Sequence, residues 1–184
     1  CYVFLCRYWI PVEYDEEGDE QEPEEEDQTV SVVYFWQGRE ASNMSWLNFT
    51  FGLLKKFEAH FGKLEVVRMH QQQENLKFLS HFHQKIVIHR GKRNLEIFGP
   101  DRLVRKNQNE LFQLRANCDP TTLRCVQINP ENPVLFSAYC YIFKVENDDN
   151  SGLVFIWIGK DCTDDDYITV AQELCRKMFT NDRY

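Results

Sequence analysis

The sequence lacks several features that mark whole classes of protein. No signal peptide is visible in its 184 residues and no apolar run is long enough to cross a bilayer, which predicts a protein that is not transmembrane. The seven cysteines are an odd number and form no C-x-x-C pair, which favours reduced thiols over a disulfide scaffold or a zinc site. No nucleophile-elbow sequence and no glycine-rich phosphate loop are present, so we expect neither an enzyme nor a bound cofactor or metal.

Positive charge is also scarce. The chain has 21 Lys and Arg against 29 Asp and Glu, a net charge of -8, which argues against a nucleic-acid partner. Most of this excess comes from residues 13–27, which hold eleven acidic residues and no basic one. The remainder of the chain is therefore mildly basic, with one acidic insertion.

An internal repeat is the most informative feature that is present. The run CYVFL at residues 1–5 resembles CYIFK at 140–144, and VVYFWQGR at 32–39 resembles LVFIWIGK at 153–160. The two offsets, 139 and 121 residues, differ by 18, which is roughly the length of the acidic stretch. The first copy thus corresponds to the second with an acidic loop inserted between two strands.

Residue patterns along the chain predict strands and helices in both copies. β-Branched and aromatic runs predict eight strands, at residues 1–9, 30–36, 64–69, 85–89, 111–116, 124–128, 140–145 and 153–158. Helical spacing of apolar residues predicts helices at 43–61, 72–82 and 165–179. In the first of these the apolar residues spread over roughly 200°, about twice the arc that packing on one sheet needs. Either a second element covers the extra width, or an exposed apolar shoulder receives a partner.

These motifs resemble the gelsolin/villin superfamily. The resemblance rests on the strand ending in Trp-x-Gly, on the long helix that follows it, and on the runs LEVVRM (64–69), FLSHF (78–82), IVIHRG (86–91), LFQLRAN (111–117) and VAQEL (170–174). It implies an α/β (α+β) fold of two gelsolin-like repeats, each a central mixed five- to six-stranded sheet between a long and a short helix. We expect residues 1–91 to be a repeat without its N-terminal strands that carries the acidic insertion 13–27. A linker at 92–109 and a second repeat at 110–184, without its C-terminal part, would follow, so that the chain is a fragment of a longer protein.

The resemblance also implies a function. Members of this superfamily regulate the cytoskeleton by binding, capping or severing actin filaments, which predicts actin as a partner and a cytoplasmic location at the actin cytoskeleton. The long helix of some repeats docks between two actin subdomains, which makes the first helix of this chain the candidate contact, through Leu47, Asn48, Phe51, Leu54 and Lys55. The alternative is an interaction scaffold that has lost actin binding and recruits signalling proteins or nuclear coactivators, with a nuclear location as well.

The family's calcium sites carry over poorly. The usual Gly-Asp pair aligns with Ala138 and Tyr139, and the helix glutamate aligns with Tyr167 in the second copy and Ser45 in the first. A second calcium site, which the family shares with bound actin, uses an aspartate near the end of the long helix, and that position aligns with Phe57. Because a hard cation needs several oxygen ligands, including carboxylates, we expect no calcium binding by the family's scheme.

A basic run suggests phosphoinositide binding, which is common in this superfamily. Seven Lys and Arg lie between residues 85 and 106, against two acidic residues. Such a cluster attracts anionic headgroups, although a solvated linker explains the same charges. The candidate residues are Lys85, Arg90, Lys92 and Arg93.

Overall fold

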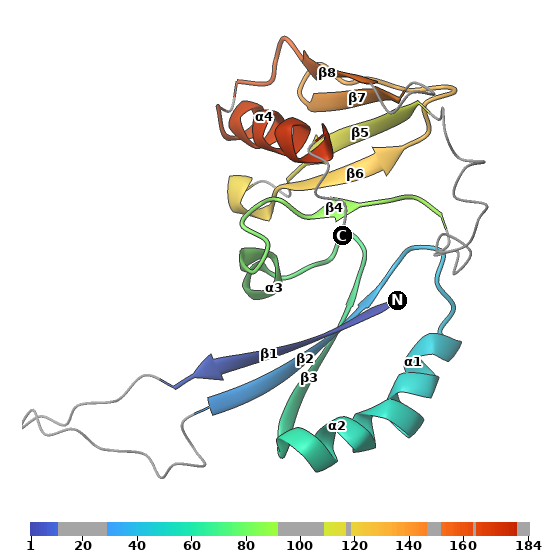
Figure 1. Cartoon of the computed structure of the whole chain (residues 1–184), viewed down its shortest axis with the longest axis vertical. Helices are drawn as coiled ribbons and strands as arrows, with labels where there is room; N and C mark the ends of the chain where they lie inside the picture. The colour runs from blue at the N-terminus through green and yellow to red at the C-terminus, as the bar shows by residue number, and fades with distance from the viewer. Residues whose placement is uncertain (11–28, 92–108, 117–118, 147–151, 164, 180–184) are drawn as a thin grey trace, which may run out of the picture. The chain divides into compact units, whose positions relative to one another are not determined.

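The chain folds into two compact units of mixed α/β structure, shown in a computed structural model in Figure 1. The structure describes residues 1–10, 29–91, 109–116, 119–146, 152–163 and 165–179. Unit 1 runs from Cys1 to Asn75 and unit 2 from Leu76 to Tyr184. The acidic insertion 13–27 and most of the predicted linker lie outside the described residues.

Unit 1 is a three-stranded mixed sheet with one long helix. Strands β1 (Tyr2–Trp9) and β2 (Thr29–Gln37) pair antiparallel, and β3 (Leu64–His70) lies parallel to β2. Parallel neighbours need a long crossover connection, which the helix between β2 and β3 supplies. The helix packs on one face of this sheet, where Val33, Phe35 and Phe49 form a buried core.

The helix of unit 1 is continuous but not uniform. It begins as α1 (Met44–Asn48), passes through a π-helical turn, η2 (Phe49–Leu53), and continues as α2 (Leu54–Phe61). Gly62, at a φ of 72°, ends it in a conformation that glycine adopts readily. The predicted helix 43–61 is therefore confirmed in extent, with an irregular turn in its middle.

Unit 2 is a five-stranded sheet with α4 (Asp165–Phe179) on one face (Figure 1). Its strands are β4 (Val87–Ile88), β5 (Glu110–Arg115), β6 (Arg124–Ile128), β7 (Cys140–Glu146) and β8 (Gly152–Ile158). They lie side by side in the order β4-β6-β5-β7-β8. Beneath α4 the core contains Phe112, Leu114, Ile142, Ala171 and Leu174, all almost fully buried.

The internal repeat is present at the level of strand register. Tyr2 pairs with Trp36 in the first hairpin, and their counterparts Tyr141 and Trp157 pair in the second. In both copies the two rings also touch, with centroids 5.9 and 5.4 Å apart. The two hairpins are thus equivalent in register as well as in sequence.

A glycine stands two residues after each of these tryptophans, at Gly38 and Gly159. Glycine is common in turns because it adopts a positive φ readily, but among the described glycines only Gly62 and Gly91 have a positive φ. At Gly159 the reason for glycine is space, because a Cβ there would lie 2.1 Å from the backbone oxygen of Ser137.

Two predicted elements are shorter than expected. All eight predicted strands form, but the strand expected at 85–89 is reduced to β4, two residues long. The helix expected at 72–82 is α3 (Leu76–Ser80). Gln72, with a φ of 73°, precedes it, and His83 and Gln84 follow it with φ values of 48° and 64°, and these left-handed residues do not continue a helix.

The compact units also divide elsewhere than the predicted domains. The division falls after Asn75, because β4 pairs in parallel with β6 and so joins the sheet of unit 2. Consequently the sheet of unit 1 has three described strands, whereas four strands were predicted within residues 1–91. The assignment of the chain to two gelsolin-like repeats stays a prediction. In the part of the chain that the structure describes, no helix has the length and apolar character to span a bilayer.

Candidate functional site

The long helix of unit 1 has one face in the core. Trp46, Phe49, Leu54 and Phe57 pack together on this inner face against β2 and β3. The aromatic rings of Trp46 and Phe49 both lie 5.1 Å from that of Phe35, centroid to centroid. These contacts fix the helix on the sheet.

The opposite side of the helix is exposed and carries most of the candidate contact residues. Leu47, Asn48, Phe51 and Lys55 are all exposed there, and the side chain of Phe51 is 78% accessible. Leu54 differs, because it is half-buried against the core of unit 1. The structure therefore brings four of the five candidates to the surface and packs the fifth, Leu54, against the edge of the core.

Further exposed apolar residues of the helix were missing from the candidate set. Met44 and Leu53 are both exposed, in the first turn and in the π turn respectively. A constant 100° per residue assigns Leu53 to the core and gives no reason to separate Leu54 from Phe51. Only the change of helical type, which the sequence pattern did not indicate, separates them.

A polar cluster holds the start of this helix. The Arg68 guanidinium donates from Nη2 to Gln37 Oε1 at 2.9 Å and to Asn43 Oδ1 at 2.7 Å, and lies 5.0 Å from the centre of the Trp46 ring. Gln37 also donates to the backbone oxygen of Ala41. These bonds join the ends of β2 and β3 to the residues that lead into the helix, and so hold its start on the sheet.

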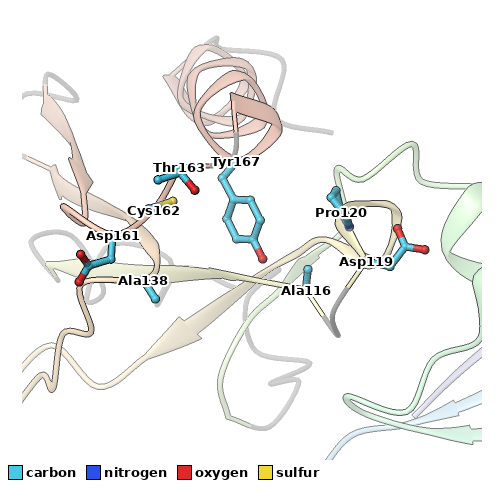
Figure 2. A pocket seen from close by; sticks show the side chains of 8 residues that line it. All are labelled: Ala116, Asp119, Pro120, Ala138, Asp161, Cys162, Thr163 and Tyr167. Atoms are coloured by element: carbon cyan, nitrogen blue, oxygen red, sulfur yellow. The ribbon is translucent and has the colours of Figure 1, made fainter.

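A pocket in unit 2 contains two of the positions that align with the family's calcium ligands. Ala138 and Tyr167 both line this pocket, which has a volume of about 260 Å³. Figure 2 shows the Tyr167 ring descending from α4 between Asp161 on one side and Asp119 on the other. A phenol and a methyl group thus stand where the resemblance places a carboxylate and a glycine.

The two carboxylates of the pocket already have partners. Asp119 Oδ1 accepts from the backbone N–H of Thr121 at 2.9 Å and from its hydroxyl at 2.7 Å, and these bonds lower the pKa of Asp119. Asp161 Oδ2 accepts from the Ser137 hydroxyl at 2.5 Å. Among the described residues no group of three or more His, Cys, Asp or Glu side chains is arranged to hold a metal ion. The expected lack of calcium binding stays a prediction.

The remaining alignment positions lie in the helix of unit 1. Ser45 is half-buried in α1, and Phe57 is half-buried in α2 next to Phe49 and Phe61. Glu58, one residue from Phe57, is exposed. Neither Ser45 nor Phe57 offers a carboxylate.

The basic candidates for phosphoinositide binding are only partly described. Lys92 and Arg93 lie outside the described residues. Lys85 forms an ion pair with Glu173 of α4, with Nζ 2.6 Å from Oε2, and this lysine lowers the pKa of Glu173. Arg90 is exposed, and its backbone N–H donates to Gln127 Oε1. One of the two described charges is thus already balanced by an acidic partner.

A mixed α/β fold with mixed sheets and few helices is consistent with gelsolin-like domains, and the comparison of sequences identifies the resemblance more narrowly. The chain is 48% identical to the human protein flightless-1 homolog over 203 aligned residues, which cover 97% of this chain and 15% of that protein. It is 50% identical to the flightless-1 homolog of Danio rerio over 97% of its length, and 46% identical to flightless-1 of Drosophila melanogaster over 98%. Almost the whole of this chain is therefore similar to one part of flightless-1. The run YFWQGREASN (34–43) and the acidic insertion are the features of the sequence that point to this protein within the superfamily.

The match covers a small part of each relative, because the chain spans about 15% of the length of these curated relatives. The repeats expected from the resemblance are the fourth and fifth of flightless-1, and their numbers stay a prediction. No family model matches the chain. A solved structure, "Crystal Structure of the Thorarchaeota 2DGel3/rabbit actin complex", covers 79% of the chain at 15% identity with a TM-score of 0.30, a likeness that supports no conclusion about partner or mechanism.

Proposed function

We propose that this chain is an actin-binding module of a gelsolin-family cytoskeletal regulator and that it binds actin independently of calcium. The contact is the exposed side of the long helix of unit 1. The chain docks as a rigid body and performs no chemistry. In this proposal the two halves of the chain are gelsolin-like repeats of a longer cytoplasmic protein that caps or severs actin filaments.

The observation that carries the proposal is an exposed apolar ridge, formed by Leu47 and Phe51, on a helix whose other side is buried. Large apolar side chains in the middle of a helix are normally covered, and an exposed row of them marks an interaction surface. Phe51 is the most exposed large apolar side chain of the described residues, and Leu47 and Lys55 stand one turn before and after it. An aromatic anchor that becomes buried on binding, with a neighbouring cation, suits a partner surface that is apolar at its centre and acidic at its rim.

Charge along the helix supports an acidic partner. Lys55, Lys56 and Lys63 lie in or directly after α2, against Glu58 as the acidic residue of that helix. The lysines steer the encounter, whereas the apolar ridge supplies the buried area.

Binding to monomeric actin in the analytical ultracentrifuge, with calcium and then with a chelator, tests the proposal. We expect equal binding in both conditions. Phe51→Ala should weaken binding by about 10- to 30-fold, the usual effect of losing an interface anchor. Leu53→Ala is the matched control, because Leu53 is also exposed but follows Phe51 by two residues, roughly half a turn around the helix. It should change binding less than about twofold.

Charge reversal gives a second pair of variants. Lys55→Glu should weaken binding by about five- to tenfold and more strongly at low salt. Lys56→Glu makes the same change of charge about 100° around the helix and should have a smaller effect. Equal effects of the two substitutions would contradict this placement of the contact.

The alternative is a protein-interaction scaffold that has lost actin binding. The replacement of the family's calcium ligands, with Tyr167 and Ala138 lining the pocket of unit 2, favours it. No actin binding in either calcium condition, together with capture of signalling or nuclear coactivator proteins through the same helix, would support it. Loss of that capture in Phe51→Ala would identify the ridge as the shared surface.

Phosphoinositide binding through Lys85, Arg90, Lys92 and Arg93 is a secondary proposal. Of the two described cations, Arg90 is exposed and Lys85 is half-buried. Sedimentation with vesicles that contain phosphatidylinositol bisphosphate, compared with phosphatidylserine vesicles of equal charge, tests it.

A further inference from the structure

The π turn in the long helix contains one residue more than a regular helix needs. The backbone N–H of Leu54 bonds to the oxygen of Phe49, five residues earlier, where an α-helix spans four. The hydroxyl of Thr50 donates to the oxygens of Trp46 and Leu47, each at 3.1 Å, and so supplies bonds to carbonyls next to the irregular turn. The turn is thus supported locally by side-chain bonds.

The core of unit 1 does not require this extra residue. In a regular α-helix, Leu54 would stand about 140° from Phe49, outside the core; the π turn brings it back to the inner face. If one residue of the turn were absent, Leu54 would follow Phe49 by four positions and stand about 40° from it around the helix. Phe57 would then follow Phe49 by seven positions and stand about 20° from it. A shorter and wholly regular helix would therefore bury the same side chains.

The π turn carries the most exposed apolar side chain of the helix. A turn with an extra residue is wider than an α turn, and Phe51 lies in its middle, on the side away from the core, where it is 78% exposed. Gly52, next to it, has open space around the position of a Cβ. Helices disfavour both glycine and π turns, and such turns occur often at functional sites.

We propose that the π turn at Phe49–Leu53 is a positioning device that projects Phe51 into an apolar cleft of actin, with Lys55 against carboxylates at the rim of that cleft. The inference rests on the proposed function for the identity of the occupant. Its structural half, that the core does not require the extra residue, stands on the register of the helix alone. A binding module keeps this turn although it costs helix stability, because Phe51 reaches farther from the axis than a regular turn allows.

Deletion of Gly52 in the full chain tests this inference. The deletion keeps every side chain of both faces and returns the helix to regular spacing. We expect the melting temperature to stay equal or rise by a few degrees, because a glycine and a π turn are removed, and we expect actin binding to weaken at least about tenfold. Gly52→Ala is the matched control, because it removes the glycine but keeps the residue count, and it should bind actin within about twofold of the parent chain.

The outcomes separate the inference from the proposed function. A melting temperature several degrees lower in the deletion variant shows that the core needs the extra residue and overturns the inference whatever actin does. A deletion variant that binds actin within about twofold of the parent chain overturns it as well. A parent chain that binds no actin overturns the proposed function and actin as the occupant, and the melting temperature then still decides whether the core needs the extra residue.

Discussion

Substitution of Gly159 by alanine should severely destabilise unit 2. A Cβ at this position would meet backbone atoms on one side only, with the Ser137 oxygen at 2.1 Å, its carbonyl carbon at 2.5 Å and the Tyr139 oxygen at 2.8 Å. None of these is the end of a flexible side chain. The segment 137–139 must therefore move away from β8 to admit a methyl group.

The cost of this movement follows from the bonds that hold the segment. The backbone N–H of Asp161 donates to the Ser137 oxygen at 2.9 Å, and that of Gly159 donates to the Tyr139 oxygen at 3.0 Å. Each bond contributes about 1 kcal/mol, and overpacking adds about 1–3 kcal/mol. We expect Gly159→Ala to lower the free energy of unfolding by about 3–5 kcal/mol, which lowers the melting temperature of unit 2 by about 10 °C or more.

The repeat supplies a matched control for this experiment. Gly38 occupies the same place after Trp36, yet its Cβ would lie 3.5 Å or more from its nearest neighbours, which is ordinary contact. Gly38→Ala should change stability by less than about 0.5 kcal/mol. Thermal unfolding, with hydrogen exchange to assign the loss to β7, β8 and α4, measures both variants. Equal stability of the two variants would refute the argument from close approach.

Three further predictions concern the chemistry of side chains in unit 2 and its surface. Burial raises the pKa of the Cys175 thiol to about 11, so at pH 8 it should react with iodoacetamide far more slowly than exposed Cys1, as mass spectrometry of alkylated peptides can show. Glu173→Gln removes the partner of Lys85 and should strengthen binding to anionic vesicles in sedimentation, unless that lysine contributes nothing to lipid binding. The pKa of Asp119 is lower in the folded chain than in the unfolded one, so its contribution to stability is present above about pH 4 and is lost as the pH falls through the folded-state pKa. Asp119→Ala should therefore lower the free energy of unfolding at pH 7 but hardly at about pH 2, as urea unfolding can measure.

The strands were predictable because their residues are locally consistent. β-Branched and aromatic runs ended by polar turns indicated all eight, and the repeat indicated that the two hairpins correspond. The strand that forms only partly is β4, whose two paired residues depend on β6, a segment from beyond the predicted linker. Local pattern gives no information about such a distant partner, and so none about which unit contains β4.

The surroundings of the repeated motif were not predictable from the motif itself. Trp36 is 8% exposed and donates from its indole N–H to Glu74 Oε1 at 2.8 Å, whereas Trp157 is 41% exposed. The two tryptophans share sequence context and strand register but differ in what covers them. Similarly, only one of the two following glycines is required by close contact.

The exposed ridge of the long helix shows which assumption of the sequence pattern fails. Apolar residues that spread over roughly 200° at constant twist indicated two possibilities, a covered helix or an exposed shoulder. Between Phe49 and Leu54 the twist is not constant, because the π turn rotates all later residues relative to the earlier ones. With this turn the core residues gather on one side and Phe51 separates from them. An apolar arc too wide for one face, in a helix with a glycine at the middle of its length, is therefore the pattern to expect where a helix carries both a core face and an exposed apolar face.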